Sequence, residues 1–528
     1  MFTGELFPYQ YEAVDRVLSD RRILVAYSMG TGKTVLTIAA LEELFGQGDI
    51  RCCVVMVPSS LKWQWAQAIA AFTDTPTRTI TLRGMDLVVP TEDVCTVVNG
   101  TPKQRQRQWQ AARHADYVIV SYGAVLHDWR HLCALPADAL VLDEASAIKN
   151  FSAQTTKRVK KLRPPVRIAL TGTPVENRAE EVFSIMEWVN AKILGRWDLF
   201  EKSYINRNFF GGVSSYKNLE LLHTNLSRAM IRKSRLDPEV AKYLPAVVET
   251  TRHVQLDKTT RAIYRAILAD LQAAMDELAE AGGDFDLAAY YAGIKPDGAF
   301  GAQGKLMARL QAARLLLDHP QLLMDSAVAF HEGTGGSQYA AEFAASRYDL
   351  PDLHAAPKLA VLDELVGTML AEDGAKAAIF TDYRKMLPYL SQRLEKHGGL
   401  VLFHGQLNSD EKAGILARFK RDPECRLFIS TNAGGYGLDL PEAQYVVNYD
   451  LPHSNGVLAQ RNTRHVRASS KFERVHVTNL VVEETIEERV QATLKLRQKL
   501  SQAVVDGTGT GALDMDIESL AEHIENVG

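Results

Sequence analysis

A glycine-rich turn follows a short apolar run near the start of the chain. Ile23-Leu24-Val25-Ala26 has the composition of a buried strand, and Gly30-Thr31-Gly32-Lys33-Thr34 comes shortly after it. Glycines let backbone N–H groups approach an anion, and a helix that starts after them points its positive end at that anion. We expect Lys33 to reach the β- and γ-phosphates of a nucleotide and the Thr34 hydroxyl to hold Mg²⁺. The segment therefore predicts the strand–turn–helix unit of a nucleotide-binding α/β fold.

Two adjacent carboxylates end a second apolar run, Leu140-Val141-Leu142-Asp143-Glu144. Side chains alternate along a strand, so the two acids point in different directions and can take different roles. We expect Asp143 to hold Mg²⁺, directly or through water, and Glu144 to orient and deprotonate the attacking water. A solvated strand end is the alternative, but the phosphate-binding turn upstream favours hydrolysis of ATP.

The composition is that of a soluble protein with two or more domains. The chain has 528 residues, of which 46% are hydrophobic and 23% charged, and a formal net charge of −4. Any nucleic-acid partner therefore requires positive charge gathered in a cleft. The five cysteines show no metal-ligand spacing and indicate reduced core thiols. We expect no signal peptide, no membrane span and a cytoplasmic location, in a bacterial cell or in the host of a bacterial virus.

Two separate α/β patterns divide the chain. Strand-like apolar runs alternate with helical stretches from Ile23 to Leu170, and again from Ala377 to Leu480. Such alternation favours parallel sheets covered by helices. Only the first pattern has a phosphate-binding turn, so the second is expected to complete the site. We expect a first lobe over 1–245 with a helical protrusion near 195–235, a second lobe over 246–506 with a helical insertion near 256–355, and a polar tail over 507–528.

An arginine-rich segment in the second lobe supplies a suitable group. The run from Gln460 to Arg467 has arginines at intervals of three. On a helix, Arg464 and Arg467 would lie on one face. A guanidinium group is always charged and can neutralise a γ-phosphate in its transition state. A solvated basic helix face is the alternative for this segment taken alone.

Further motifs accompany these segments in a fixed order: Tyr9-Gln10, Val57–Leu61, Asp143-Glu144-Ala145 with Ile148-Lys149-Asn150, Leu170–Pro174 with Glu176-Asn177, and Ser430–Leu440. With its motifs in this order, the sequence resembles helicase superfamily two, and most closely the Swi/Snf family of double-stranded DNA translocases. The resemblance spans Phe7 to about Gly507 and includes the linking segments Ile231–Pro245, His319–Leu323 and Thr485–Arg489.

The resemblance implies two RecA-like lobes with parallel sheets and helical insertions, and an ATP site and a DNA cleft between the lobes. Catalysis would rest on Lys33, Asp143, Glu144, Arg464 and Arg467, with Thr34 and Asp143 as ligands of Mg²⁺. The nucleotide would be held by Gln10, Met29, Gly30, Thr31, Gly32, Lys33, Thr34, Gly437, Asp439 and Gln460. The motif that couples hydrolysis to movement would be Thr171, Gly172 and Thr173.

Each lobe is expected to grip one stretch of phosphate backbone. Hydroxyls and backbone N–H groups at helix starts suit phosphates, and such contacts carry little sequence information. For any single position, an ordinary helix cap or turn is the alternative. The candidates are Ser59, Ser60, Lys62, Ser121 and Tyr122 in the first lobe, and Thr381, His404, Gly405, Thr431 and Asn432 in the second.

The sequence departs from the family pattern at three places. Tyr27-Ser28 stand where two acids are usual, Ser146 replaces a histidine, and the arginine segment has the general helicase spacing. The leading hypothesis is a DNA-dependent ATPase that translocates along double-stranded DNA and remodels or displaces what is bound there. The alternatives are a strand-separating DNA helicase in replication or repair, an RNA helicase, and a nucleotide-switched DNA clamp. The sequence does not identify any protein partner.

Overall fold

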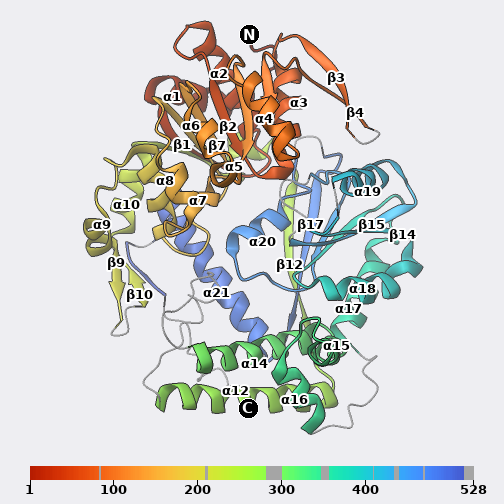
Figure 1. The fold of residues 1–528 in the computed structure, drawn as a ribbon. Coiled ribbons are helices and arrows are strands. Elements are labelled where there is room, and N and C mark those ends of the chain that lie inside the picture. The colour runs from red at the N-terminus through yellow and green to blue at the C-terminus, as the bar shows by residue number, and fades with distance from the viewer. Residues whose placement is uncertain are drawn as a thin grey trace.

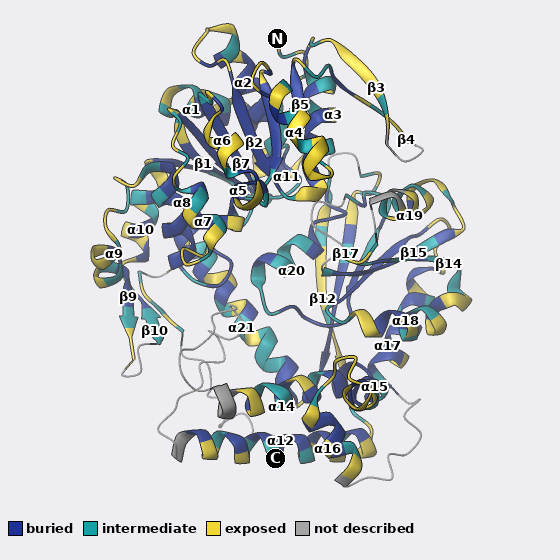
Figure 2. Cartoon of the chain, in the orientation of Figure 1, coloured by how far each residue is buried: buried dark blue, intermediate teal, exposed yellow. Residues whose placement is uncertain are grey.

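The computed structural model describes residues 1–82, 85–208, 212–280, 300–346, 356–407, 409–432, 439–467, 470–509 and 511–515. These residues form two lobes, each built on a parallel sheet with helices around it (Figure 1). Most central strands of both sheets are buried, whereas the covering helices expose one side (Figure 2). No helix among the described residues is long and apolar enough to span a membrane.

The first lobe holds a seven-stranded sheet in the order β11-β1-β8-β7-β2-β6-β5, and every neighbouring pair is parallel. Its two faces pack into separate hydrophobic clusters, as apolar strands covered on both sides require. The carboxyl ends of β1, β7 and β8 meet at one edge, where ligands of open α/β sheets bind. The parallel strands are β1 (Arg22–Tyr27), β2 (Cys53–Val57), β5 (Cys95–Val97), β6 (Tyr117–Ser121), β7 (Ala139–Asp143), β8 (Val166–Leu170) and β11 (Met230–Lys233).

Helices and two antiparallel hairpins surround this sheet. One hairpin pairs β3 (Thr77–Leu82) with β4 (Met85–Pro90), and the other pairs β9 (Ile205–Arg207) with β10 (Val213–Tyr216). The helices are α1 (Pro8–Asp20), α2 (Lys33–Gly46), η1 (Ser59–Leu61), α3 (Lys62–Phe72), α4 (Pro102–Ala111), α5 (Ala124–His127), α6 (Trp129–Cys133), η2 (Ala145–Ile148), α7 (Gln154–Val159), α8 (Glu180–Asn190), α9 (Trp197–Tyr204), α10 (Leu219–Ser227) and α11 (Pro238–Ala241).

The second lobe holds a six-stranded parallel sheet in the order β12-β17-β16-β13-β15-β14. Its strands are β12 (Ala246–Val254), β13 (Ala377–Thr381), β14 (Gly399–Phe403), β15 (Cys425–Thr431), β16 (Tyr445–Asn448) and β17 (Arg474–Val482). A helical insertion follows β12, with α12 (Lys258–Glu280), α14 (Phe300–Asp318), α15 (Pro320–His331) and α16 (Gln338–Ser346). The remaining helices are α17 (Pro357–Met369), η3 (Arg384–Met386), α18 (Leu387–Leu394), η4 (Glu395–His397), α19 (Ser409–Arg421), α20 (Asn455–Asn462) and α21 (Ile486–Ser501).

Helix α21 runs from the second lobe back to the first (Figure 1). Ile486 at its start packs with the helical insertion, and Leu500 near its end packs in the core of the first lobe. A short π-helix, η6 (Gln502–Asp506), continues into that core, and Asp506 pairs with Arg232 across 2.6 Å. The predicted boundary at 506 is therefore wrong, because the apolar side chains at the end of α21 belong to the first lobe.

The predicted polar tail is wrong for residues 511–515. Here β18 (Leu513–Asp514) pairs antiparallel with β10, and the Leu219 N–H donates to the Gly511 carbonyl oxygen at 2.9 Å. Leu513 and Met515 pack against the core of the first lobe. Residues two apart in an extended segment share a face, and both side chains are partly buried against that core.

Candidate active site between the lobes

The glycine-rich turn connects β1 to α2, as the sequence predicts. Gly30 and Gly32 have φ angles of 82° and 78°, in the left-handed region that glycine adopts readily. Gln10 packs directly on this turn: its Nε2 donates to the Thr31 carbonyl oxygen at 2.9 Å, and its Oε1 accepts from the Phe7 N–H at 2.8 Å. A Cβ atom at position 32 would lie 2.3 Å from the Gln10 Nε2. Gln10 therefore fixes the turn in this structure, and a contact with adenine stays a prediction.

Lys33 stands at the start of α2. Its Nζ donates to the carbonyl oxygens of Tyr27 at 3.0 Å and Ser28 at 3.1 Å. Burial lowers the pKa of Lys33, and the nearby carboxylates of Glu144 and Asp143 oppose this shift. The turn thus holds a cation beside the two acids, which is where phosphate oxygens would need one.

Asp143 is fixed at the end of β7 by the protein itself. Its Oδ2 accepts from the Trp65 Nε1–H at 2.8 Å, and its Oδ1 accepts from the Glu144 N–H at 3.0 Å. Burial raises the pKa of Asp143, and the Trp65 hydrogen bond lowers it. Trp65 was not among the predicted site residues, although it follows the Val57–Leu61 motif closely in the sequence and lies on the buried face of α3.

Glu144 has the features of a general base. Its φ angle is 51°, which is a strained conformation for a residue with a side chain. Its Oε2 is buried and accepts no hydrogen bond from the described residues. Burial, followed by the charge of Asp143, raises the pKa of Glu144 to about 7, while Lys33 opposes the shift. A base with a pKa near neutrality is suited to accept a proton from water.

The arginine segment of the second lobe lies against the turn of the first. A Cβ atom at Gly30 would be 2.5 Å from the Val466 carbonyl oxygen and 3.2 Å from the Arg467 Nη1. The Thr463 Oγ1 also contacts the Met29 sulfur at 3.2 Å. The two lobes therefore meet at the place where the γ-phosphate of a nucleotide is expected.

Both predicted arginines are at this junction. The Arg467 Nε donates to the Asp439 Oδ1 at 2.7 Å, and its Nη1 donates to the Thr463 carbonyl oxygen at 2.6 Å. The Arg464 guanidinium lies 5.6 Å from the centre of the Phe380 ring and is buried. Asp439 thus orients Arg467 here, and direct nucleotide binding by Asp439 stays a prediction.

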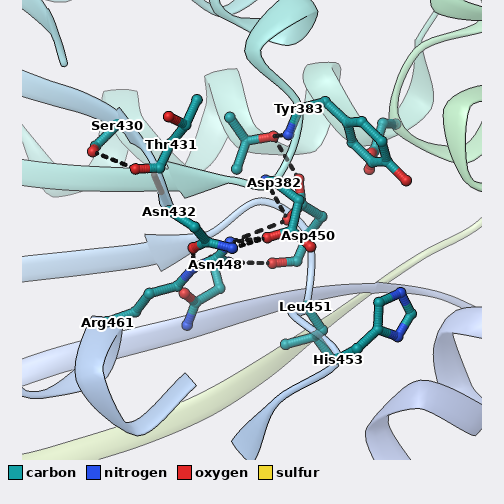
Figure 3. Close-up of polar contacts among 12 residues, drawn as sticks. Asp382, Tyr383, Ser430, Thr431, Asn432, Asn448, Asp450, Leu451, His453 and Arg461 are labelled. Atoms are coloured by element: carbon teal, nitrogen blue, oxygen red, sulfur yellow. Dashed lines mark hydrogen bonds and ion pairs between the residues drawn. The ribbon is translucent and has the colours of Figure 1, made fainter. Parts of the chain in front are cut away.

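The prediction that these arginines share one face of a helix is wrong. Helix α20 ends at Asn462, before Arg464, and the chain turns there. Arg461, on the last turn of the helix, is drawn into the lobe, where its Nη1 donates to the Asp450 carbonyl oxygen at 2.7 Å and its Nη2 pairs with Asp382 (Figure 3). This buried ion pair anchors the end of α20 and the turn that follows it.

Two residues predicted to contact DNA from the second lobe, Thr381 and Asn432, belong to this network, and Figure 3 shows Asn432 beside Arg461. The Thr381 Oγ1 donates to the Asp450 Oδ2 at 2.5 Å, and Thr431 is also buried. The Asn432 Oδ1 accepts from the Arg461 Nε at 2.7 Å. The Thr381 and Thr431 side chains lie inside the lobe in this structure, and a phosphate contact at either position stays a prediction. The Asn432 side chain is engaged inside the lobe in the same way.

Two first-lobe candidates also have structural roles. The Lys62 ammonium is buried and donates to the Val98 carbonyl oxygen at 3.0 Å and to the Asn99 Oδ1 at 2.6 Å. The Tyr122 hydroxyl donates to the Asp143 carbonyl oxygen at 2.8 Å. Both polar groups face inward in this structure, and phosphate contacts by Lys62 and Tyr122 stay predictions.

The predicted coupling motif lies beside the phosphate-binding turn. The Thr171 N–H donates to the Val25 carbonyl oxygen at 3.2 Å, and the Thr171 Oγ1 accepts from the Thr173 N–H at 3.2 Å. A Cβ atom at Gly172 would lie 3.0 Å from the Met29 Cγ. A movement of the phosphate-binding turn would therefore be transmitted directly to the coupling motif.

The other predicted residues divide by exposure. Ser59, Ser60 and Gly405 are exposed, whereas Ser121, His404, Thr34 and Gln460 are partly exposed. Gly437 lies outside the described residues.

The site fits ATP with Mg²⁺. Gly30 and Gly32 present no side chain that would block a phosphate, Lys33 supplies a cation, and Glu144 has a buried oxygen that accepts no hydrogen bond from described residues. No group of three or more histidine, cysteine or acidic side chains in the described residues could hold a metal alone. Mg²⁺ held by one or two protein ligands together with phosphates and water stays a prediction.

A strand-end acid pair, a phosphate turn and arginines from a second lobe define the class of two-lobed nucleotide hydrolases. Comparison with known families gives two matches: the SNF2-related domain over residues 9–289 and the helicase conserved C-terminal domain over residues 357–469. The chain therefore belongs to the SNF2-related family and is an ATP-hydrolysing enzyme of helicase superfamily two.

Three relatives illustrate the similarity. The putative ATP-dependent helicase/translocase YwqA of Bacillus subtilis is 26% identical over 514 residues, which cover 96% of this chain and 49% of YwqA. The RAD54-like DNA repair and recombination protein of Drosophila erecta is 23% identical over 523 residues, covering 94% and 62% of the two chains. The Pyrococcus furiosus Hef helicase domain aligns with a TM-score of 0.54 and 17% identity, over 93% of this chain and 98% of that domain. The chain thus spans less than two thirds of these two curated relatives, and the Hef likeness shows the two-lobed fold alone.

Proposed function

We propose that the chain is a DNA-dependent ATPase that converts ATP hydrolysis into sequence-independent movement along double-stranded DNA, remodelling or displacing what is bound there. The observation that carries this proposal is the contact of Gly30 in the first lobe with Val466 and Arg467 in the second. A hydrolytic site divided between two lobes links the state of the nucleotide to the separation of the lobes.

The proposed chemistry assigns one task to each group. Lys33 would neutralise the β- and γ-phosphates, and Glu144 would accept the proton of the attacking water. Arg464 and Arg467 would neutralise the charge that develops on the transferred phosphoryl group. Thr34 and Asp143 would hold Mg²⁺, which supplies further neutralisation of phosphate charge when bound.

Double-stranded DNA is the proposed track. Family membership and the relatives' names, which mention translocation and DNA repair, support a nucleic-acid partner. Because the chain has a net charge of −4, binding would rest on local groups rather than on overall attraction. Among the candidates for phosphate contacts, Ser59, Ser60 and Gly405 are exposed, and Ser121 and His404 are partly exposed.

The rate of ATP hydrolysis with four polymers tests this function. The rate is measured without polymer, with single-stranded DNA, with duplex DNA and with RNA, at one fixed salt concentration. We expect duplex DNA to stimulate hydrolysis at least as well as single-stranded DNA, and RNA to stimulate it less. Stimulation by RNA alone would support an RNA helicase, and an equal, very slow rate in all four conditions would support a nucleotide-switched clamp.

A further inference from the structure

Glu176 occupies an unusual position between the lobes. It follows the coupling motif in the first lobe and is 5% exposed. Its Oε2 accepts from the Lys149 Nζ at 2.5 Å. Its backbone is also fixed, because the Glu181 Oε2 accepts from the N–H groups of Glu176 at 2.6 Å and Asn177 at 2.9 Å. The first lobe therefore presents the fixed, buried carboxylate of Glu176 to the second lobe.

The second lobe receives this carboxylate at the first turn of α20. The Ser454 Oγ, which also caps α20 by accepting from the Val457 N–H at 3.4 Å, donates to the Glu176 Oε2 at 2.9 Å. Gly456 leaves the necessary space, since a Cβ atom there would be 2.3 Å from the Glu176 Cδ. An anion at a helix N-terminus is favourable, because the backbone N–H groups point towards it.

The opposite end of the same helix leads to the catalytic arginines. Helix α20 spans Asn455–Asn462, and Arg461 anchors its end before the chain turns to Arg464 and Arg467. A displacement of the first turn of this short helix would therefore be transmitted to both arginines. Lys149 and Glu176 belong to the first lobe and would stay paired on separation, whereas Ser454 and Gly456 would leave with the second lobe.

We propose that Glu176 is a positioning residue: its carboxylate forms a clasp with Ser454 and Gly456 that sets α20, and through it Arg464 and Arg467, when the lobes close. Glu176 does not touch the nucleotide in this proposal. The clasp rests on the proposed ATPase function and adds a specific contact between the lobes to it. It requires ATP hydrolysis but not movement along DNA.

A double-mutant cycle tests the clasp. Gly456→Ala places a methyl group where the Glu176 carboxyl group lies, so it should lower kcat about tenfold or more, the scale of one charged hydrogen bond, with little change in the KM for ATP. Glu176→Ala should lower kcat similarly. In the Glu176→Ala background, Gly456→Ala should change kcat less than about twofold, because the clash is gone.

Two controls separate the clasp from loss of folding. Gly414→Ala adds the same methyl group to helix α19 of the same lobe, where nothing lies within 4 Å, and should leave kcat unchanged. Glu176→Gln keeps an oxygen that can accept from Ser454 and should retain more activity than Glu176→Ala, with thermal unfolding measured for every variant. The proposal is overturned if Gly456→Ala is fully active, or if its cost is the same with and without Glu176. If the double-mutant cycle gives the expected result but DNA does not stimulate hydrolysis, only the proposed translocation is contradicted.

Discussion

Trp65→Phe is expected to impair hydrolysis although Trp65 is remote from the phosphate-binding turn in sequence. The substitution keeps an aromatic ring in the core but removes the N–H that donates to the Asp143 Oδ2 at 2.8 Å. Both partners are buried, so water cannot replace the lost donor. The free-energy cost therefore falls on the ionised form of Asp143.

The size of the effect follows from the kind of hydrogen bond. A hydrogen bond to a charged group contributes about 1.5–3 kcal/mol, and about 1.4 kcal/mol corresponds to a factor of ten in rate. We therefore expect kcat/KM to fall between roughly tenfold and 150-fold where ionisation of Asp143 limits the rate. Burial already raises the pKa of Asp143, and loss of the Trp65 donor raises it further.

The pH dependence identifies the cause. Because the ionised carboxylate is the active form, the deficit should be largest at acid pH and should shrink as the pH rises, moving the acid limb of the profile to higher pH. The measurement is steady-state ATPase activity across pH for Trp65→Phe and for Trp63→Phe, which removes an indole from the same helix α3. A loss that is constant with pH, or an equal loss in Trp63→Phe, would refute the reasoning.

Three further predictions concern the site and its supposed DNA contacts. Glu144→Gln should retain ATP binding but slow turnover about 10²-fold or more, and wild-type activity should fall as the pH drops below about 7, since the base must be unprotonated; a variant with normal turnover would exclude Glu144 as the base. Arg464→Ala and Arg467→Ala should each slow turnover on the order of 10³-fold with a much smaller change in ATP affinity, measured by nucleotide binding and hydrolysis; normal hydrolysis by both would leave the arginines without a catalytic role. Lys62→Met should lower the thermal unfolding temperature yet leave the affinity for duplex DNA and its salt dependence unchanged, because the ammonium faces Val98 and Asn99. A weaker dependence of DNA affinity on salt in this variant would instead support Lys62 as a phosphate contact.

The fold and the positions of the candidate hydrolytic residues could be predicted because they depend on local patterns. A buried strand that ends in a glycine turn, or in two acids, fixes its own geometry within a few residues. Lys33, Asp143 and Glu144 therefore lie at the ends of the expected elements. The two-lobe division also followed from the two groups of alternating apolar runs, because each group forms a parallel sheet of its own.

The surroundings of the DNA-contact candidates were less predictable, because a polar residue at the end of a strand can face either a ligand or the interior of its lobe. Thr381 and Asn432 bind the interior ions Asp450 and Arg461, which are distant in sequence. Helix α20 also ends earlier than its arginine spacing indicated, and Arg461 on its last turn is held by buried partners from other elements. Such outcomes depend on tertiary charge pairing, which no local pattern records.

The described hairpin β9–β10 bears on whether strands are separated. This hairpin pairs with β18, and Phe209 and Phe210 lie outside the described residues. The sequence of Asn206–Tyr216 favours a turn that packs in the core, with an aromatic wedge between strands as the alternative.

Displacement of a third DNA strand tests the central claim of movement along duplex DNA. A labelled oligonucleotide is bound as a triplex on a duplex, and its release is followed with ATP, without ATP, and with Glu144→Gln, beside a tailed duplex of equal length. We predict ATP-dependent release of the third strand by the wild-type chain alone and little separation of the tailed duplex. Efficient unwinding of the tailed duplex, together with stimulation of hydrolysis only by single-stranded DNA, would contradict duplex translocation and support a strand-separating helicase.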